Sequence, residues 1–313
     1  MARLLVTGGA GFLGSHLVDA LIERGHAVTV LDRKPSKWLP RDIKLIQADL
    51  ADRDALAAAV TGADGVYHLA GFADLNAAKT RPLDTVHANI VGTVELLEAM
   101  RAHGVSRFLF ASTAYVYSRD GGFYRCSKQA CESYIEEYAR TFGLRYTVIR
   151  YGSLYGPRAD ASNGVYRLLR TAMTEGRLSY SGAPDDIREY IHVEDAAQLS
   201  VDLLDGAFQD QHVMLTGASP TRAAELFTMF EEILGARIEI DYRRTSGPGS
   251  GHYAVTPYAY TPRPGKKLVT THYVDMGQGL LRMVEDIYRE LGREPGREPG
   301  REPGREPGRE DRS

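Results

Sequence analysis

The sequence predicts an α/β fold, a doubly wound parallel sheet with a smaller C-terminal lobe. Strand-like and helix-like segments alternate as far as residue 151, which is typical of parallel strands joined by right-handed helical crossovers. A short apolar run at 4–6 leads into a glycine-rich turn at 7–14 and then a helical pattern. A second apolar run, at 27–31, ends on the acid Asp32. In such sheets, ligands bind beyond the carboxyl ends of the strands.

Each element follows from its apolar pattern. We expect strands at 4–6, 27–31, 43–48, 65–70, 108–112 and 146–151, and helices at 14–24, 55–60, 85–103 and 127–141. Beyond residue 151 glycine and proline recur, and we expect helices at 165–174, 193–204 and 223–234 with strands at 213–216 and 238–242. Residues 1–154 then form a dinucleotide-binding domain of the Rossmann type, and residues 155–291 a lobe interleaved with the sheet.

Composition excludes several classes of protein. A net charge of −3 on 313 residues gives no electrostatic reason to bind nucleic acid or a membrane surface. The two cysteines, Cys126 and Cys131, support neither a disulfide framework nor a zinc pattern, which favours a reducing, cytoplasmic setting. The first strand starts too near Met1 for a signal peptide, and no apolar run approaches the roughly 18 residues of a membrane span.

A low-complexity tail covers residues 292–313. A Gly-Arg-Glu-Pro unit repeats there, and a proline in every fourth position prevents a regular helix. With nothing apolar to bury, we expect a solvated appendage. Residues 244–251 read as a polar, glycine-rich loop.

The glycine turn carries the first functional prediction. Gly8, Gly11 and Gly14 let the backbone turn tightly and approach a pyrophosphate at the positive end of the following helix. Asp32, about 20 residues on, is placed to accept hydrogen bonds from the adenosine ribose hydroxyls. Arg33 could hold a 2′-phosphate, but the acid before it repels that group, so we expect NAD rather than NADP.

The second functional prediction rests on a tyrosine and a lysine with helical spacing. Tyr124 and Lys128 are four residues apart and face the same way on a helix. A free phenol has a pKa of about 10, and a nearby ammonium and a cationic nicotinamide lower it, which makes Tyr124 a workable general base. Ser112 and Thr113 follow the fifth strand, where a hydroxyl can bridge substrate and phenol. Serine and threonine hydroxyls also cap strand ends, which is the structural alternative for both residues. Of the two, we favour Thr113 as the catalytic residue.

A third pattern looks like a metal cluster. His192, Glu194 and Asp195 lie close together in the sequence. At a strand-to-helix junction, Glu194 and Asp195 more simply favour the first turn of the next helix, so we expect no metal site.

These motifs together resemble the extended short-chain dehydrogenase/reductase family, in its branch of NAD-dependent nucleotide-sugar epimerases and dehydratases. The resemblance covers roughly residues 3–290 and rests on residues 7–14, 32, 49–50, 68–71, 89–93, 112–117, 124–128 and 188–193. It implies a tightly held NAD, a nucleotide-diphosphate sugar as substrate, and a homodimer formed by the helices at 91–103 and 127–141.

The resemblance also implies the site residues. The implied cofactor contacts are Gly8, Gly11, Phe12, Leu13, Gly14, Asp32, Arg33, Asp49, Leu50, Leu69, Ala70, Gly71, Asn89, Tyr124, Lys128 and Tyr151. The implied substrate contacts are Thr113, Ser153, Asn163, Arg188 and Arg263. The planar, permanently charged guanidinium of Arg188 suits a diphosphate.

The residues after Thr113 favour one reaction. Dehydratases of the family carry Asp-Glu there, whereas this chain has Ala114 and Tyr115, neither of which does acid–base work on carbon. The pattern resembles UDP-galactose 4-epimerases and predicts epimerisation at C4 through a 4-keto sugar. A dehydratase, decarboxylase or 4-keto reductase of the family, or a non-catalytic NAD-binding protein, remain alternatives.

The chain departs from the family pattern at three places. The 118–123 loop is short, Ser153 stands where an asparagine is usual, and Lys266 replaces an acid after Arg263. An open sugar pocket, an acidic sugar, or a degenerate enzyme would fit these changes.

Overall fold

The computed structural model describes residues 1–243, 253–260 and 276–291. The chain divides into two compact units, Met1–Thr261 and Pro262–Ser313. The repeat tail at 292–313 and the loop at 244–251 lie outside the described residues, as does Arg263.

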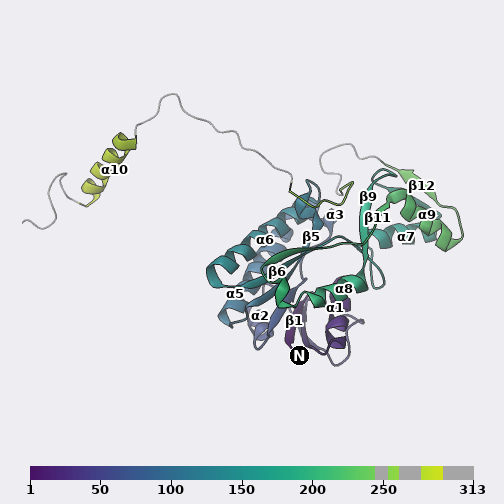
Figure 1. Ribbon diagram of the computed structural model, residues 1–313, viewed down its shortest axis with the longest axis horizontal. Helices are drawn as coiled ribbons and strands as arrows, with labels where there is room; N and C mark the ends of the chain where they lie inside the picture. Colours follow the sequence, from purple (N-terminus) through teal and green to yellow (C-terminus); the bar gives the residue numbers. More distant parts are fainter. Residues whose placement is uncertain (244–252, 261–275, 292–313) are drawn as a thin grey trace, which may run out of the picture. The chain divides into compact units, whose positions relative to one another are not determined.

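A seven-stranded parallel sheet organises the first unit, in the order β10-β6-β5-β4-β1-β2-β3 among the described residues. Figure 1 shows β1, β5 and β6 of this sheet with helices around them. Its strands are β1 (Arg3–Thr7), β2 (Ala27–Asp32), β3 (Lys44–Gln47), β4 (Gly65–His68), β5 (Arg107–Thr113), β6 (Arg145–Tyr151) and β10 (Gln211–Leu215). The order reverses between β1 and β4, as expected for a doubly wound sheet. The predicted fold class is therefore confirmed.

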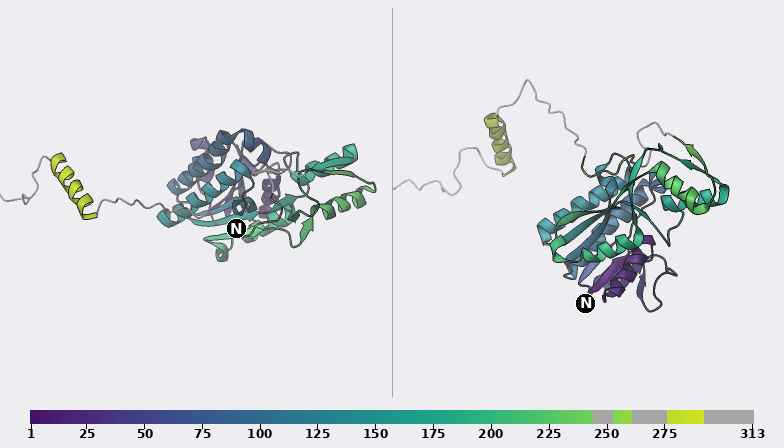
Figure 2. Two further views of the ribbon diagram at one scale, coloured as in Figure 1. Left: turned by 90° about the horizontal axis from the view of Figure 1, so that it is seen from above. Right: turned by 45° about the vertical axis from the view of Figure 1, so that its right-hand side comes forward.

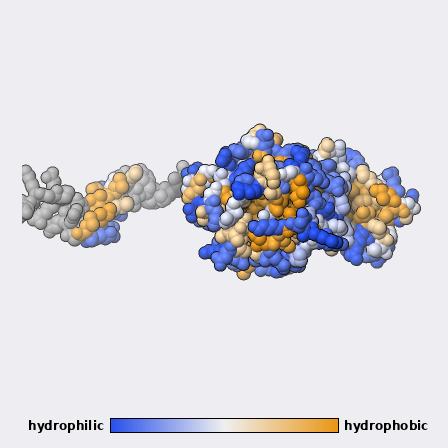
Figure 3. Space-filling model, turned by 90° about the horizontal axis from the view of Figure 1, so that it is seen from below, coloured by the Kyte–Doolittle hydropathy of each residue, from blue (hydrophilic) through white to orange (hydrophobic). Residues whose placement is uncertain are grey.

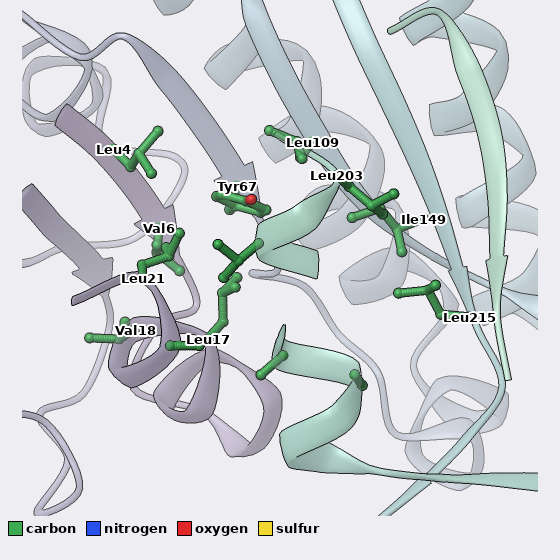
Figure 4. Packing of buried hydrophobic residues seen from close by; sticks show 14 of the residues in the cluster. Leu4, Val6, Leu17, Val18, Leu21, Tyr67, Leu109, Ile149, Leu203 and Leu215 are labelled. Atoms are coloured by element: carbon green, nitrogen blue, oxygen red, sulfur yellow. The ribbon is translucent and has the colours of Figure 1, made fainter. Parts of the chain in front are cut away.

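Strand alternation divides the core between the two faces of the sheet. On one face, Leu4, Val6, Tyr67 and Leu109 pack against α1 (Phe12–Glu23) and α8 (Val193–Asp202), as Figure 4 shows for α1. The neighbouring strand residues, such as Leu5, Val66 and Phe108, point the other way. They pack against α2 (Arg53–Val60), α5 (Gly92–Ala102) and α6 (Gly122–Phe142). Burial on both faces explains why these strands are apolar throughout.

The long helix expected at 85–103 is present, but its winding changes along its length. After the short helices α3 (Leu75–Thr80) and α4 (Pro82–Thr85), residues Val86–Val91 form a π-helical turn, η1, before α5 begins. The Asn89 side chain in this turn binds both Phe72 N and Phe72 O, which holds the turn to a loop distant in sequence. Residues at both ends of this turn keep right-handed helical backbone angles, so α4, η1 and α5 form one helical run with a π segment inside it.

The smaller lobe has its own core and lies at one end of the sheet (Figure 2). It contains β7 (Ser153–Tyr155), α7 (Gly164–Glu175), β8 (Arg177–Tyr180), β9 (Ile187–His192), β11 (Pro220–Arg222), α9 (Ala223–Leu234) and β12 (Glu239–Tyr242). The sequence did not predict β7, β8 or β11, which are short, whereas β9 is the strand expected before the helix that starts at Val193. Short 3-10 turns lie at η2 (Ala114–Tyr117) and η3 (Gly206–Phe208). Residues after 192 return to the main sheet as α8 and β10.

In the second unit, the described part is the helix α10 (Met276–Glu290), which the sequence analysis did not anticipate. Leu280, Met283, Val284 and Ile287 recur at helical spacing and are exposed, and Figure 3 shows an apolar face on this helix. In the described ranges, no helix is long and apolar enough to cross a bilayer.

Candidate active site

The glycine turn joins β1 to α1 and leaves room for a ligand at the start of the helix. Gly8 has φ of +72°, and a Cβ there would lie 2.6 Å from Ala70 N. A Cβ on Gly14 would lie 2.1 Å from the carbonyl oxygen of Gly8, so the turn and helix approach too closely for any larger residue. Gly11 is the N-cap of α1 and has no side chain to cap it. The N–H groups of the first turn, which includes Phe12 and Leu13, are thus available to an anion.

Asp32 ends β2 beside this turn. Its Oδ2 accepts a hydrogen bond from Ala10 N at 3.1 Å and its Oδ1 one from Lys34 N at 3.2 Å. These bonds fix the carboxylate against the glycine turn, where the remaining lone pairs suit ribose hydroxyls. Arg33 lies 3.7 Å from Asp49 in an exposed ion pair. The residues present therefore fit a dinucleotide with free ribose hydroxyls.

Residues after β3 and β4 form the neighbouring walls. Leu50 is buried against Gly92, where a Cβ would lie 2.9 Å from Leu50 Cδ1. Ala70 N donates to Thr7 Oγ1 at 3.4 Å, while Leu69 is partly buried. At Gly71, an added Cβ would be 3.9 Å from Lys128 Nζ, so this loop adjoins the predicted catalytic lysine.

His68, at the end of β4, is a buried neutral base. Thr93 uses its proton to bind Asn89 O at 2.5 Å, so its oxygen accepts from His68 Nε2 at 2.9 Å. Nδ1 therefore accepts from the Thr7 hydroxyl at 2.6 Å. Burial, aided by the charge of Lys128, lowers the pKa of His68 to about 3. The ring is thus a structural link between β1, β4 and α5.

Thr113, Tyr124 and Lys128 come together at the carboxyl end of β5. Helix α6 begins at Gly122, five residues before the predicted start, so Tyr124 lies in its first turn and Lys128 in the next. The side chains of Thr113 and Tyr124 share a hydrogen bond. Lys128 Nζ donates to Ala111 O at 2.7 Å and lies 5.9 Å from the centre of the Tyr124 ring. As a whole residue, Tyr124 is partly exposed.

The protein alone does not lower the pKa of the Tyr124 phenol. Burial raises that pKa, and the hydrogen bond with Thr113 opposes the rise. Burial also lowers the pKa of Lys128. The sequence analysis expected a lowered pKa for the Tyr124 phenol. That lowering therefore depends on a bound cationic nicotinamide as well as on Lys128.

Ser112 is not part of this group. Its hydroxyl donates to Glu132 Oε1 at 2.5 Å, and Glu132 forms a buried ion pair with Arg150 at 2.6 Å. Arg150 also binds the hydroxyl of Tyr117. In this structure the Ser112 oxygen is engaged in a buried cluster and Thr113 is the hydroxyl beside Tyr124, so the catalytic role of Ser112 stays a prediction.

Three further predicted contacts have structural side chains instead. Asn89 donates to Ser127 Oγ at 2.8 Å in addition to binding Phe72, so both ends of its amide are occupied. The Tyr151 hydroxyl is bound to Ser200 Oγ at 2.6 Å within the core. Asn163 caps α7 and donates to Leu154 O at 2.8 Å. Each of these side chains is engaged within the fold, and their contacts with cofactor or substrate stay predictions.

Arg188 lies on β9 among aromatic rings. Its guanidinium is 5.9 Å from the Tyr180 ring and 5.8 Å from the Tyr253 ring, and it hydrogen-bonds Tyr190. Nε is buried without a hydrogen-bond partner, and no carboxylate of the described residues forms an ion pair with this side chain. A largely buried guanidinium without a counter-ion is costly, so this arrangement suits an anionic ligand. Ser153 lies nearby and hydrogen-bonds Tyr253.

The His192 pattern serves the fold. His192 caps α8 with its ring, and Glu194 and Asp195 lie in the first turn, as predicted. Within the described ranges, no group of three or more His, Cys, Asp or Glu residues could hold a metal ion.

The sequence analysis missed Tyr253. It brings an aromatic ring to Arg188 and Ser153 from a segment with no strong helix or strand pattern. The recurrence of tyrosine at 253, 258 and 260, with Thr256 between them, was the available signal.

The fold and this group of residues define a dinucleotide-binding α/β protein with a paired tyrosine and lysine at the edge of its sheet. The chain belongs to the NAD dependent epimerase/dehydratase family, whose model matches residues 4–215. NAD is the cofactor of this family, and the glycine turn and Asp32 fit it.

Similar proteins cover most of the chain. A UDP-glucose 4-epimerase of Corynebacterium glutamicum is 29% identical over 79% of this chain and 86% of its own length. A dTDP-glucose 4,6-dehydratase of Mycobacterium tuberculosis is 32% identical over 62% of this chain and 66% of its own length. The crystal structure of a UDP-glucose 4-epimerase of Thermotoga maritima with UDP-glucose has a TM-score of 0.74 at 28% identity, over 92% of this chain and 99% of that one.

Proposed function

We propose that this protein is an NAD-dependent epimerase that inverts C4 of a nucleotide-diphosphate sugar, a UDP-hexose or a UDP-uronic acid, through a 4-keto sugar. The observation that carries the proposal is the Thr113–Tyr124 hydrogen bond, with Lys128 beside it and no acid at positions 114 and 115. The epimerase relatives support this choice of reaction.

In this mechanism, the Tyr124 oxygen accepts the proton of the C4 hydroxyl and later returns it. When bound, NAD supplies the acceptor and donor of the C4 hydride. Thr113 orients the phenol and the sugar oxygen through its hydroxyl. Arg188 holds the diphosphate while the keto sugar turns to present its other face. Because burial raises the pKa of Tyr124, we expect activity to increase with pH until the phenol is ionised.

The side chain of Tyr115 argues against the elimination of water that a dehydratase catalyses. Burial raises the pKa of the Tyr115 phenol, and its ring packs 4.7 Å from that of Tyr253. A neutral phenol held in this way is a poor base for carbon.

Elimination is the second candidate, because a carboxylate lies in this region and dehydratases are among the relatives. Asp120, on the short loop before α6, acts electrostatically on Tyr115. As the general acid of a dehydratase, Asp120 would be essential. A decarboxylase, a 4-keto reductase and a non-catalytic NAD-binding protein are further possibilities.

Product analysis tests the proposal. The NAD-loaded protein is incubated with UDP-glucose or UDP-glucuronic acid, and products are separated by chromatography and weighed by mass spectrometry. Epimerisation leaves the mass unchanged, whereas a dehydratase product lacks one water and a decarboxylase product lacks carbon dioxide. Tyr124→Phe should abolish the reaction, and Asp120→Asn should retain it. Loss of water that requires Asp120 would contradict the epimerase proposal.

We also propose that two copies pair through α5 and α6, which lie side by side in Figure 1. Tyr134 and Phe142 of α6 are exposed apolar side chains that a second copy would cover. We place this enzyme in the cytoplasm, because Cys126 and Cys131 are both free thiols.

A further inference from the structure

Residues 253–260, which we call the tyrosine strap, run beside the lobe strand that carries Arg188. Ile187 N donates to Ala254 O at 2.7 Å, and Ile187 forms a parallel bridge with Val255. Thr256 Oγ1 accepts from Glu189 N at 3.2 Å. These bonds lie on either side of Arg188 along β9, so they set the register of the strap relative to this residue.

Two tyrosines of the strap pair with two tyrosines of η2. The ring centres of Tyr253 and Tyr115 are 4.7 Å apart, and those of Tyr260 and Tyr117 are 4.9 Å apart. The turn η2 follows Thr113 directly and precedes the short 118–123 loop. The strap therefore packs on the segment that links the predicted catalytic hydroxyl to the start of α6.

Tyr253 is held rigidly in this position. The residue is 4% exposed, and its side chain hydrogen-bonds both Ser153 and Thr256. Its ring lies 5.8 Å from the Arg188 guanidinium, on which Tyr180 also acts from 5.9 Å. Aromatic faces attract a guanidinium and restrict its orientation without neutralising its charge, as a carboxylate would.

We propose that Tyr253 is a positioning residue for Arg188, which it orients to bind the diphosphate of the substrate. This inference rests on the proposed function for the identity of the anion. Tyr253 restricts the guanidinium through its ring and keeps the arginine charge free for the ligand. The ring is also packed against Tyr115, so its position does not depend on the phenol alone.

Binding of UDP to the NAD-loaded protein tests this role without any turnover. Isothermal titration calorimetry compares the wild type with Tyr253→Leu, Arg188→Gln and the double variant, and thermal unfolding and NAD content check that each is folded. Tyr253→Leu should weaken UDP binding about tenfold, in line with the energy of a desolvated cation–π contact. In the Arg188→Gln background, the same change should have less than a threefold effect, because the guanidinium it orients is gone.

Two further variants distinguish the contribution of the Tyr253 ring to UDP binding from those of its hydroxyl and of the rest of the strap. Tyr253→Phe keeps the ring and should bind UDP within about threefold of the wild type. Tyr258→Leu removes a strap tyrosine whose hydroxyl binds Glu189, outside the contacts of Arg188, and should also bind normally. If Tyr253→Leu weakens binding equally with Arg188 or Gln at 188, Tyr253 does not act through the arginine and the inference is wrong. If the folded, NAD-loaded wild type binds no UDP, the proposed function fails together with this inference.

Discussion

The hydroxyl of Ser112 donates a 2.5 Å hydrogen bond to the buried carboxylate of Glu132. The next residue along the chain, Thr113, bonds Tyr124 instead. Adjacent residues of a strand point to opposite faces, so two neighbouring hydroxyls at the end of β5 have different functions. One stabilises the fold, and the other belongs to the predicted reaction centre.

Variants of the two hydroxyls should therefore separate stability from activity. Thr113→Val should lower kcat about 100-fold, because the phenol loses its orienting partner, with little change in stability. Ser112→Ala should leave kcat within about threefold but lower the free energy of unfolding by about 1–3 kcal/mol, because Glu132 loses a buried donor. Steady-state kinetics and urea unfolding measure both effects. A large loss of kcat in a stable Ser112→Ala variant would show that Ser112 is a catalytic residue.

Removing one partner of the Glu132–Arg150 pair should be more damaging than removing both. The two side chains are 4% and 5% exposed, so a charge left alone there is poorly solvated. Glu132→Leu should destabilise the protein by about 3–5 kcal/mol, and adding Arg150→Met should recover part of that loss. Chemical denaturation of the single and double variants measures the difference. Additive destabilisation would show that the buried charge is not the cause.

Acidification should destabilise the protein through His68. The unfolded histidine has a pKa of about 6.5, whereas burial lowers that of the folded residue to about 3. Between these values the unfolded chain binds a proton that the folded chain does not, so the free energy of unfolding decreases as the pH falls. The slope is about 1.4 kcal/mol per pH unit below pH 6.5, and above it the contribution is constant.

The comparison that isolates this effect uses His68→Gln. Denaturant unfolding between pH 7 and pH 5 should show a shallower pH dependence in this variant than in the wild type. His103→Gln, at an exposed position after α5, is the matched histidine substitution outside the core. Identical slopes in the wild type and His68→Gln would contradict the assignment.

A methyl group on Gly14 should prevent NAD binding. The added Cβ would lie 2.1 Å from Gly8 O, so the turn must shift away from the geometry that fits a pyrophosphate. The NAD released on denaturation, measured per mole of protein, should be near the full amount for the wild type and close to zero for Gly14→Ala. Gly164→Ala is the control, because a Cβ there meets no atom within 4 Å. Full NAD content in Gly14→Ala would rule out this turn as the binding site.

The proposed dimer should dissociate when charge is placed on its apolar face. Tyr134 of α6 is 48% exposed, and an arginine there would be buried without a partner at the interface. Light scattering after size exclusion should give about twice the 34.5 kDa chain mass for the wild type and the single mass for Tyr134→Arg. Met173→Arg, on α7, should leave the dimer intact. A monomeric wild type would contradict the proposal directly.

Local chemistry explains which elements were predictable. The glycine turn, Asp32 and the alternating strands and helices depend on neighbouring residues, and the structure has them where the sequence indicated. The short strands β7 and β11 depend on pairing between distant segments, so their residues alone carry little signal. The π turn at Val86–Val91 carries Asn89, which accepts a hydrogen bond from Phe72 N, another contact that residue patterns do not reveal.

For the site, residue type and spacing named Thr113, Tyr124 and Lys128 as candidates, and the family resemblance named Arg188, because each carries a chemical group that few alternatives could replace. Spacing did not reveal which polar side chains are already hydrogen-bonded to other residues of the fold. Packing alone decided that Ser112 binds Glu132 and that Tyr253 lies against Arg188. Such contacts join residues 20 and more positions apart, and their energies arise only when the folded chain excludes water from between them.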